Sequence, residues 1–130
     1  MNANPTSTAS VAPALQSTVV RAPERARSAA TTLEAFDVYR VSLDACRACA
    51  PIAPALSASL RDQLLRGSSP VVLNTAEGFG SASRGVKRRH YEIARGSATE
   101  CVAILDLASA LGVEGVPAPA RALFTRVAMM

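Results

Sequence analysis

The chain has 130 residues, a mass of 13.5 kDa, a hydrophobic content of 49% and a formal net charge of +4 at pH 7. No apolar run approaches the roughly 18 residues that a membrane-spanning helix needs, so we expect no membrane segment. One histidine leaves little room for a His-ligated metal site, and three cysteines cannot all pair within the chain, so we expect a cytoplasmic protein rather than a secreted disulfide scaffold.

Residues 1–32 differ in composition from the rest of the chain. Ala, Ser, Thr and Pro fill 20 of these 32 positions, and three arginines against one glutamate give a net charge of +2. Such a segment buries too little apolar surface to offset the entropy of ordering it, which predicts a disordered tail. An acid-poor, Ser- and Arg-rich start is also typical of an organellar targeting segment, and a mis-assigned start is a third interpretation. We place the folded domain at residues 33–130.

The first predicted helix begins at a capping box, Thr31-Thr32-Leu33-Glu34, and ends at Pro51 and Pro54. Its larger apolar residues recur at steps of three and four, which places them on one face. These residues are Leu33, Phe36, Tyr39, Leu43 and Cys46.

The second predicted helix starts at Ser59, and Pro70 falls inside it, which predicts a bend or a short break. One face of this helix carries Leu60, Leu64, Gly67, Val71, Asn74 and Gly78.

The third predicted helix covers residues 86–111 and ends at Gly112. Its apolar stripe consists of Val86, His90, Ile93, Ser97, Cys101, Ile104, Ala108 and Leu111. A second strip, part of which we interpret as a contact with another subunit, consists of Ala94, Ala98, Val102 and Leu105. A fourth helix starts near Pro119 and carries Leu123, Val127 and Met130. Because no strand pattern occurs, we predict an all-α domain of four helices.

Two motifs in this region carry a resemblance to a known family. Asn74-Thr75-Ala76-Glu77-Gly78 is followed, in the third helix, by Ile93-Ala94-Arg95-Gly96-Ser97 with Glu100. The chain resembles the four helix bundle protein family, which includes proteins encoded within intervening sequences of bacterial 23S ribosomal RNA genes. It is also similar to the accessory variability determinants of diversity-generating retroelements.

The resemblance implies an antiparallel up-down four-helix bundle and a ring-shaped homo-oligomer, a homopentamer in known members. It also implies a basic surface for nucleic acid, and no catalytic residues are assigned in the family.

Five polar residues near the middle of the second and third helices allow two interpretations: Asn74, Glu77, Arg95, Ser97 and Glu100. In the first, the two glutamates act in acid–base or metal chemistry, although the Glu-x-x-His pairs of a di-iron bundle are missing. In the second, which we favour, the arginine neutralises one glutamate within a structural network. Gly96 in mid-helix indicates a close approach of two helices. We therefore expect no catalytic residue, no metal and no cofactor.

Cys46 and Cys49 form a Cys-x-x-Cys motif. With Cys101 and His90 they supply enough ligands for a Cys3His zinc site, and the motif also occurs in redox proteins. No thioredoxin-like strand pattern surrounds it, and cysteines on an alanine-rich helix usually pack as small apolar residues. We favour a packing role.

A basic cluster marks the start of the third helix. Arg84, Lys87, Arg88, Arg89 and Arg95 against Glu92 give a charge of +4 within twelve residues. Cations at a helix N-terminus oppose the helix dipole by up to about 1 kcal/mol, which favours a bound anion. The cluster predicts phosphate contacts through Arg84, Lys87, Arg88 and Arg89. A solvated, arginine-rich helix start is the other interpretation.

These features favour a non-enzymatic oligomeric scaffold that binds RNA or DNA phosphates without strong sequence specificity. The alternative is a protein-interaction adaptor that binds an acidic or reverse-transcriptase-like partner without touching nucleic acid.

Overall fold

The structure, a computed structural model, describes residues 33–130, so the predicted tail and Thr31 and Thr32 of the capping box lie outside the described residues. Four α-helices and one 3-10 turn, with no strand, make up this part of the chain. In chain order they are α2 (Asp37–Cys49), η1 (Ala53–Ala55), α3 (Ala58–Gly80), α4 (Arg84–Ala110) and α5 (Ala118–Met129). The predicted all-α domain of four helices is confirmed.

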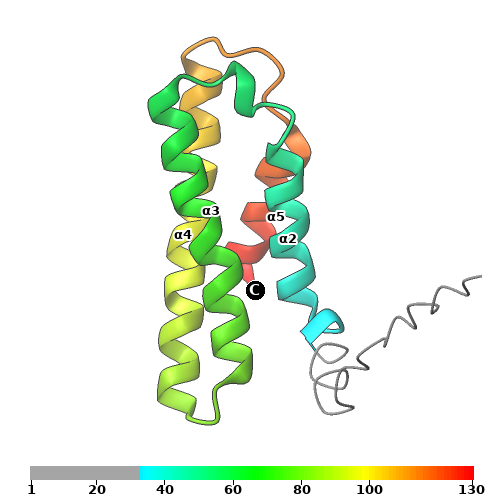
Figure 1. The fold of residues 1–130 in the computed structure, drawn as a ribbon, viewed down its shortest axis with the longest axis vertical. Coiled ribbons are helices and arrows are strands. Elements are labelled where there is room, and N and C mark those ends of the chain that lie inside the picture. Colours follow the sequence, from blue (N-terminus) through cyan, green and yellow to red (C-terminus); the bar gives the residue numbers. More distant parts are fainter. Residues whose placement is uncertain (1–32) are drawn as a thin grey trace, which may run out of the picture.

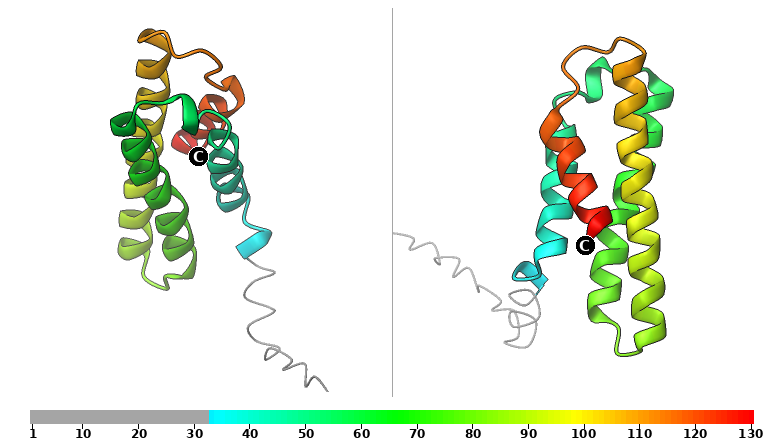
Figure 2. Two further views of the ribbon diagram at one scale, coloured as in Figure 1. Left: turned by 45° about the horizontal axis from the view of Figure 1, so that its top comes forward. Right: turned by 180° about the vertical axis from the view of Figure 1, so that it is seen from behind.

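The long helices α3 and α4 lie side by side along their length and are joined by a short turn at residues 81–83 (Figure 1). Their 23 and 27 residues correspond to about 35 and 40 Å. The shorter α2 and α5, about 20 and 18 Å long, pack on each other and against the hairpin (Figure 2). No helix in residues 33–130 combines the length and apolarity needed to cross a membrane.

The core lies where all four helices meet, and Phe124 of α5 is its largest fully buried side chain. Around it the buried residues are small and aliphatic, as expected for a chain poor in aromatics. They include Val41, Ala45 and Cys49 of α2, Leu60, Leu64 and Val71 of α3, and Ala98, Cys101, Ile104, Leu105 and Ala108 of α4.

The first helix starts later than predicted and turns a different face inward. Helix α2 begins only after Phe36, whose extended backbone (ψ 110°) precedes the first turn and whose side chain makes no cap. Its buried residues are Val41, Ser42, Ala45 and Cys49, whereas the predicted stripe of larger residues is only half-buried. The small residues allow α2 to approach its neighbours closely, and the larger ones cover the margins of the contact.

The second helix keeps the predicted face but not the predicted cap. The hydroxyl of Ser57, rather than that of Ser59, accepts a hydrogen bond from the amide of Leu60 at 3.3 Å. Helix α3 continues through Pro70 without the predicted short break. Helix α3 buries apolar side chains against α4, and Val71, the residue after Pro70, is fully buried. This burial offsets the roughly 3 kcal/mol that an internal proline costs.

The third helix has the predicted extent within two residues, but only part of the predicted stripe faces the core. Cys101, Ile104 and Ala108 are buried as predicted, while Val86 and Ile93 of the same stripe are 46% and 41% exposed. The second strip, predicted in part to meet another subunit, lies mainly inside the domain, where Ala94, Ala98 and Leu105 are buried. The first part of the stripe that was expected to be core, with Val86 and Ile93, is therefore an outward apolar surface.

The ends of α4 and α5 follow the sequence signals. Gly112 adopts a positive φ of 81°, and the amide of Val113 donates to the carbonyl of Ala108 at 3.0 Å, which ends α4 as expected. Pro119 lies in the first turn of α5, where its missing N–H costs nothing.

Candidate functional site

A groove opens beside the first three turns of α4, where α5 no longer covers it. Helix α5 ends about halfway along the α3–α4 hairpin (Figure 2, right). The groove has a volume of about 750 Å³ and is bounded by the start of α2, by α3, by α4 and by the end of α5. Its lining residues are Phe36, Val38, Thr75, Arg84, Lys87, Arg88, Tyr91, Glu92, Ala94, Arg95, Val127 and Met130.

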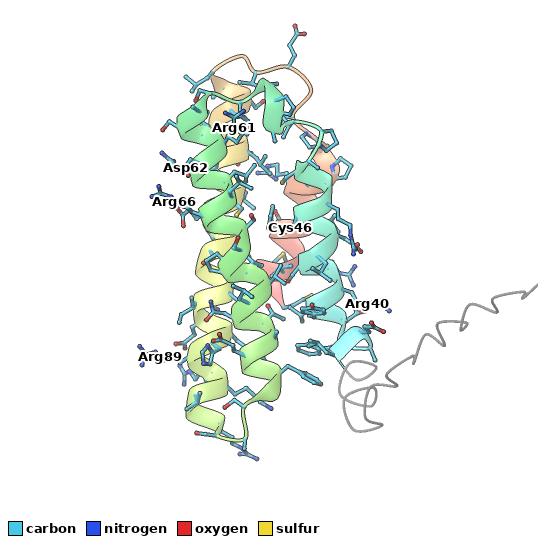
Figure 3. The ribbon with its side chains drawn as sticks, in the orientation of Figure 1. Arg40, Cys46, Arg61, Asp62, Arg66 and Arg89 are labelled. Carbon is cyan, nitrogen blue, oxygen red and sulfur yellow. The ribbon has the colours of Figure 1, made fainter. Side chains whose placement is uncertain are left out.

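Three of the four residues predicted to contact phosphate line this groove: Arg84, Lys87 and Arg88. The fourth, Arg89, projects from the opposite side of α4, away from α2 (Figure 3). Arg95, predicted to belong to the polar network, joins the three on the groove wall. The structure therefore regroups the cluster into four cations that share one surface.

The charge of the groove is only partly neutralised. Arg88 donates to Glu92 at 2.8 Å, and this ion pair holds the pKa of the glutamate below its usual range. Within residues 33–130, no carboxylate lies within ion-pair distance of Arg84, Lys87 or Arg95. Among the side chains that line the groove, four cations against one carboxylate give a net charge of +3.

Three aromatic side chains from distant parts of the chain meet at the same place. The ring centroid of Phe36 lies 4.8 Å from that of Phe79 and 6.3 Å from that of Tyr91. Phe36 and Tyr91 line the groove. Phe79 and Tyr91 are close to the basic cluster in the sequence, but Phe36 was assigned only to the apolar stripe of the first helix. No local signal brings it to the groove, because the contact depends on the packing of α2 against the hairpin.

Gly78 explains how Tyr91 is held. A Cβ added at Gly78 would lie 2.7 Å from Cδ1 of Tyr91 and closer still to Cε1, so the ring rests directly on the backbone of α3. Partial burial raises the pKa of the Tyr91 hydroxyl. Gly96, by contrast, has nothing within 4 Å of an added Cβ, so the close approach expected there does not occur.

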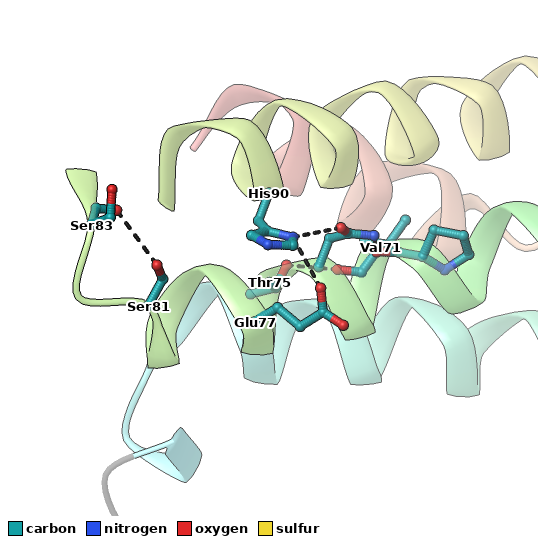
Figure 4. A network of polar contacts seen from close by, with 8 residues as sticks. Val71, Thr75, Glu77, Ser81, Ser83 and His90 are labelled. Carbon is teal, nitrogen blue, oxygen red and sulfur yellow. Dashed lines mark hydrogen bonds and ion pairs between the residues drawn. The ribbon is translucent and has the colours of Figure 1, made fainter. Parts of the chain in front are cut away.

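The predicted polar network is divided between two sides of the hairpin. Nδ1 of His90 lies 3.0 Å from Oδ1 of Asn74 and 3.0 Å from Oε2 of Glu77 (Figure 4). The side-chain amide of Asn74 donates to the carbonyl of Pro70 at 3.0 Å, which leaves Oδ1 toward the ring. Both oxygens facing Nδ1 accept hydrogen bonds, so this nitrogen carries the proton.

The other members of the predicted network lie apart from this cluster. Arg95 forms no ion pair with Glu77 or Glu100, and Glu77 takes His90 as its partner instead. Glu100 is exposed, and Ser97 is half-buried with no side-chain hydrogen bond to another described residue. His90 belongs to the polar network but was missing from the predicted one. The sequence pattern placed it only on the apolar stripe of the third helix.

The three cysteines are free thiols, and two of them are buried in the core. Burial raises the pKa of Cys49 to about 11 and that of Cys101 to about 12, so both thiols are protonated at neutral pH. Cys46 is half-buried with its Sγ 3.8 Å from the carbonyl of Ser68. In residues 33–130 no group of three or more Cys, His, Asp or Glu side chains is placed to hold a metal ion.

The domain is thus an all-helical protein of four helices with a basic, aromatic-lined groove beside the long hairpin. The family model for the 23S rRNA-intervening sequence protein matches residues 34–114, and the chain belongs to this family. No curated protein and no solved structure matches the chain.

Proposed function

We propose that this protein is a non-enzymatic oligomeric scaffold of the cytoplasm whose groove binds RNA or DNA phosphates without strong sequence specificity. In this proposal the helices form an antiparallel up-down bundle, and copies assemble into a ring, a homopentamer by resemblance to the family. The observation that carries the proposal is the convergence of Arg84, Lys87, Arg88 and Arg95 on one groove, three of them without a carboxylate partner in residues 33–130.

Phosphate binding follows from the electrostatics of the groove. A net charge of +3 beside a hollow surface raises the local concentration of anions. Each phosphate that is neutralised releases counterions, so the affinity falls steeply with salt. Arginine and lysine contacts to phosphate carry no base information, so we expect weak sequence preference.

Assembly is supported by two exposed apolar surfaces on different sides of the subunit. The α3 surface contains Leu65 and Leu73, which are 61% and 60% exposed. At 100° per residue, both lie about 120–160° from Gly67, the glycine that faces α4. The α4 surface contains Val86, Ile93 and Leu107, which are 41–47% exposed and lie within about 60° of each other.

Two unlike apolar surfaces suit a head-to-tail contact, in which the α3 surface of one copy meets the α4 surface of the next. Contacts of this type close into rings when the rotation between copies allows it. A ring presents one basic groove per copy, so a nucleic acid that spans several grooves binds by avidity.

Nucleic-acid binding is tested by fluorescence anisotropy of labelled RNA and DNA, titrated with the full chain at several salt concentrations. The test variant replaces Arg84, Lys87 and Arg95 with Gln; the control replaces Arg40, Arg47 and Arg66, which changes net charge equally. We expect the groove variant to lose more than about tenfold in affinity and to lower the salt slope by about 2–3, at about 0.7–0.9 per phosphate. Equal losses in both variants, or no binding by the wild type at low salt, would refute the proposal.

Head-to-tail assembly is tested by measuring molar mass in solution. Leu73→Lys and Ile93→Lys each remove one of the two surfaces, so each variant alone should be monomeric. An equimolar mixture should form a dimer, because Leu73→Lys retains the α4 surface and Ile93→Lys retains the α3 surface. Gln63→Lys is the control and should assemble as the wild type does. A monomeric wild type contradicts assembly, and a monomeric mixture contradicts the head-to-tail contact.

A protein-interaction adaptor is the second candidate, favoured by the apolar part of the groove lining, which includes Phe36, Val38 and Val127. Such an adaptor binds an acidic partner through the same cations. In that case the wild type fails to bind nucleic acid at low salt, while the Gln variant of the groove loses affinity for an acidic helical peptide.

A further inference from the structure

We infer that the groove receives unpaired bases, so that the nucleic acid bound by this protein is single-stranded rather than duplex. The inference rests on the proposed function and names its substrate class. It depends on an observation that phosphate binding alone does not use: aromatic rings lie among the groove cations.

Tyr91 and the groove cations share one face of α4. Lys87 lies four residues before Tyr91 in the sequence, and Arg88 lies three residues before it. Arg95 lies four residues after Tyr91. Residues at these spacings lie on the same side of a helix. Tyr91 is therefore flanked by positive charge on both sides along the groove, over about 16 Å between Arg84 and Arg95.

The aromatic surface is larger than one ring and is held in place. Phe36 packs 4.8 Å from Phe79 and 6.3 Å from Tyr91, which gathers three of the five aromatic residues of the chain at one end of the hairpin. Tyr91 rests on the backbone at Gly78, where no side chain separates the ring from α3. A ring fixed in this way loses little conformational freedom when a base stacks on it.

Single-stranded nucleic acid matches this combination because it offers phosphates and exposed base faces together. Sites for single strands combine a positively charged groove with aromatic side chains on which bases stack. In a duplex the base faces are stacked on each other, so a duplex meets only the cations at the rim. A groove of about 750 Å³ also lies in the range of about 300–1,000 Å³ that holds small organic ligands, large enough for a nucleotide.

The first measurement compares an oligouridine with a blunt RNA hairpin that has the same number of phosphates, by anisotropy at one salt concentration. Stacking is worth about 5- to 150-fold in affinity per base. We expect the oligouridine to bind at least about fivefold more tightly. Equal affinities would overturn this inference and leave the proposed function intact, whereas binding of neither oligonucleotide would defeat both. Uridine monophosphate alone tests whether one free nucleotide is enough for binding. If the bases of a single strand stack on the aromatic rings while its phosphates contact the cations, the monomer should bind much more weakly than the oligouridine.

The second measurement uses tyrosine fluorescence, because the chain has two tyrosines and no tryptophan. In Tyr39→Phe the only emitter is Tyr91, and in Tyr91→Phe it is Tyr39, which does not line the groove. Unlabelled oligouridine should quench the emission of Tyr39→Phe and leave that of Tyr91→Phe unchanged after correction for absorption. Quenching by an acidic helical peptide but not by oligouridine would assign the groove to a protein partner and overturn the inference.

A third measurement removes an aromatic face without removing charge. Phe36→Leu keeps an apolar side chain just before α2, and Tyr39→Leu is the matched control outside the groove. We expect Phe36→Leu to weaken binding of the oligouridine about fivefold or more, with hairpin affinity and salt slope unchanged. Circular dichroism confirms that both variants fold, and an equal effect of both on the oligouridine would refute the role of Phe36.

Discussion

The contact between Tyr91 and Gly78 gives a direct test of the packing beneath the groove. Alanine is favoured over glycine in a helix by about 1 kcal/mol, so an added methyl group stabilises the fold where there is space for it. Gly96 has such space, and we expect Gly96→Ala to raise the free energy of unfolding by about 0.5–1 kcal/mol. At Gly78 the methyl group would overlap the ring of Tyr91.

The expected cost at Gly78 follows from this overlap. Forcing an extra methyl group into a packed site costs about 1–3 kcal/mol. Set against the gain in helix propensity, Gly78→Ala should be destabilising by up to about 2 kcal/mol. Urea denaturation of the two variants at equal protein concentration measures both free energies, and their difference isolates the cost of the overlap.

A double-mutant cycle assigns that cost to the ring. In a Tyr91→Ala background the overlap is gone, so Gly78→Ala should stabilise as Gly96→Ala does. The coupling energy between positions 78 and 91 should then be about 1–3 kcal/mol. If Gly78→Ala is as stabilising as Gly96→Ala in the wild-type background, Tyr91 does not rest on α3, and the reasoning about its fixed position is refuted.

Three further predictions concern helix ends and ion pairs. Ser57→Ala should lower the free energy of unfolding by about 1 kcal/mol through loss of the N-cap, and Ser59→Ala by clearly less; equal effects in urea denaturation would contradict the cap. The ion pair with Arg121 lowers the pKa of Asp106, so its stabilising effect should be present at neutral pH and lost as the pH falls through that lowered pKa. The difference in unfolding free energy between wild type and Asp106→Asn should therefore shrink as the solution is made acidic, and a constant difference would contradict the pairing. Glu77→Ala should cost no more than about 1 kcal/mol, because this carboxylate is 61% exposed, and a loss of several kcal/mol would show that it is buried in the native protein.

Periodicity and end signals were sufficient to find the helices, but they identified the buried face correctly only in α3. The starts of α3 and α5 and both ends of α4 came within about two residues of those expected, the usual uncertainty of helix ends, and Gly112 ends α4 as its sequence position indicated. In α2 and α4 the larger apolar residues were expected inside. The structure buries Val41, Ser42, Ala45 and Cys49 in α2, and in α4 it buries Ala94 and Ala98 together with Ile104 and Leu105. Small side chains among these residues allow the helices to pack closely.

The groove was predictable only in part. The sequence alone showed the cluster of basic residues and how many of them it contains. Their division into a groove set and an outward Arg89 depends on how α4 is rotated about its axis, which the sequence pattern misjudged. Phe36 and Val127 reach the groove from helices that begin or end beside it, and such contacts depend on the relative lengths and positions of whole helices.

The rotation of α4 links the fold to both proposed activities. The side of this helix that carries Ala98 and Leu105 is core in the second half of α4, and the same side carries the groove cations with Tyr91 in the first three turns. Another side carries Val86 and Ile93 outward. Since groove residues and outward residues alternate along the first turns of α4, a substitution on one side leaves the residues of the other side in place. A variant that loses nucleic acid but retains its assembly state therefore separates the groove from the outward surface within a single helix.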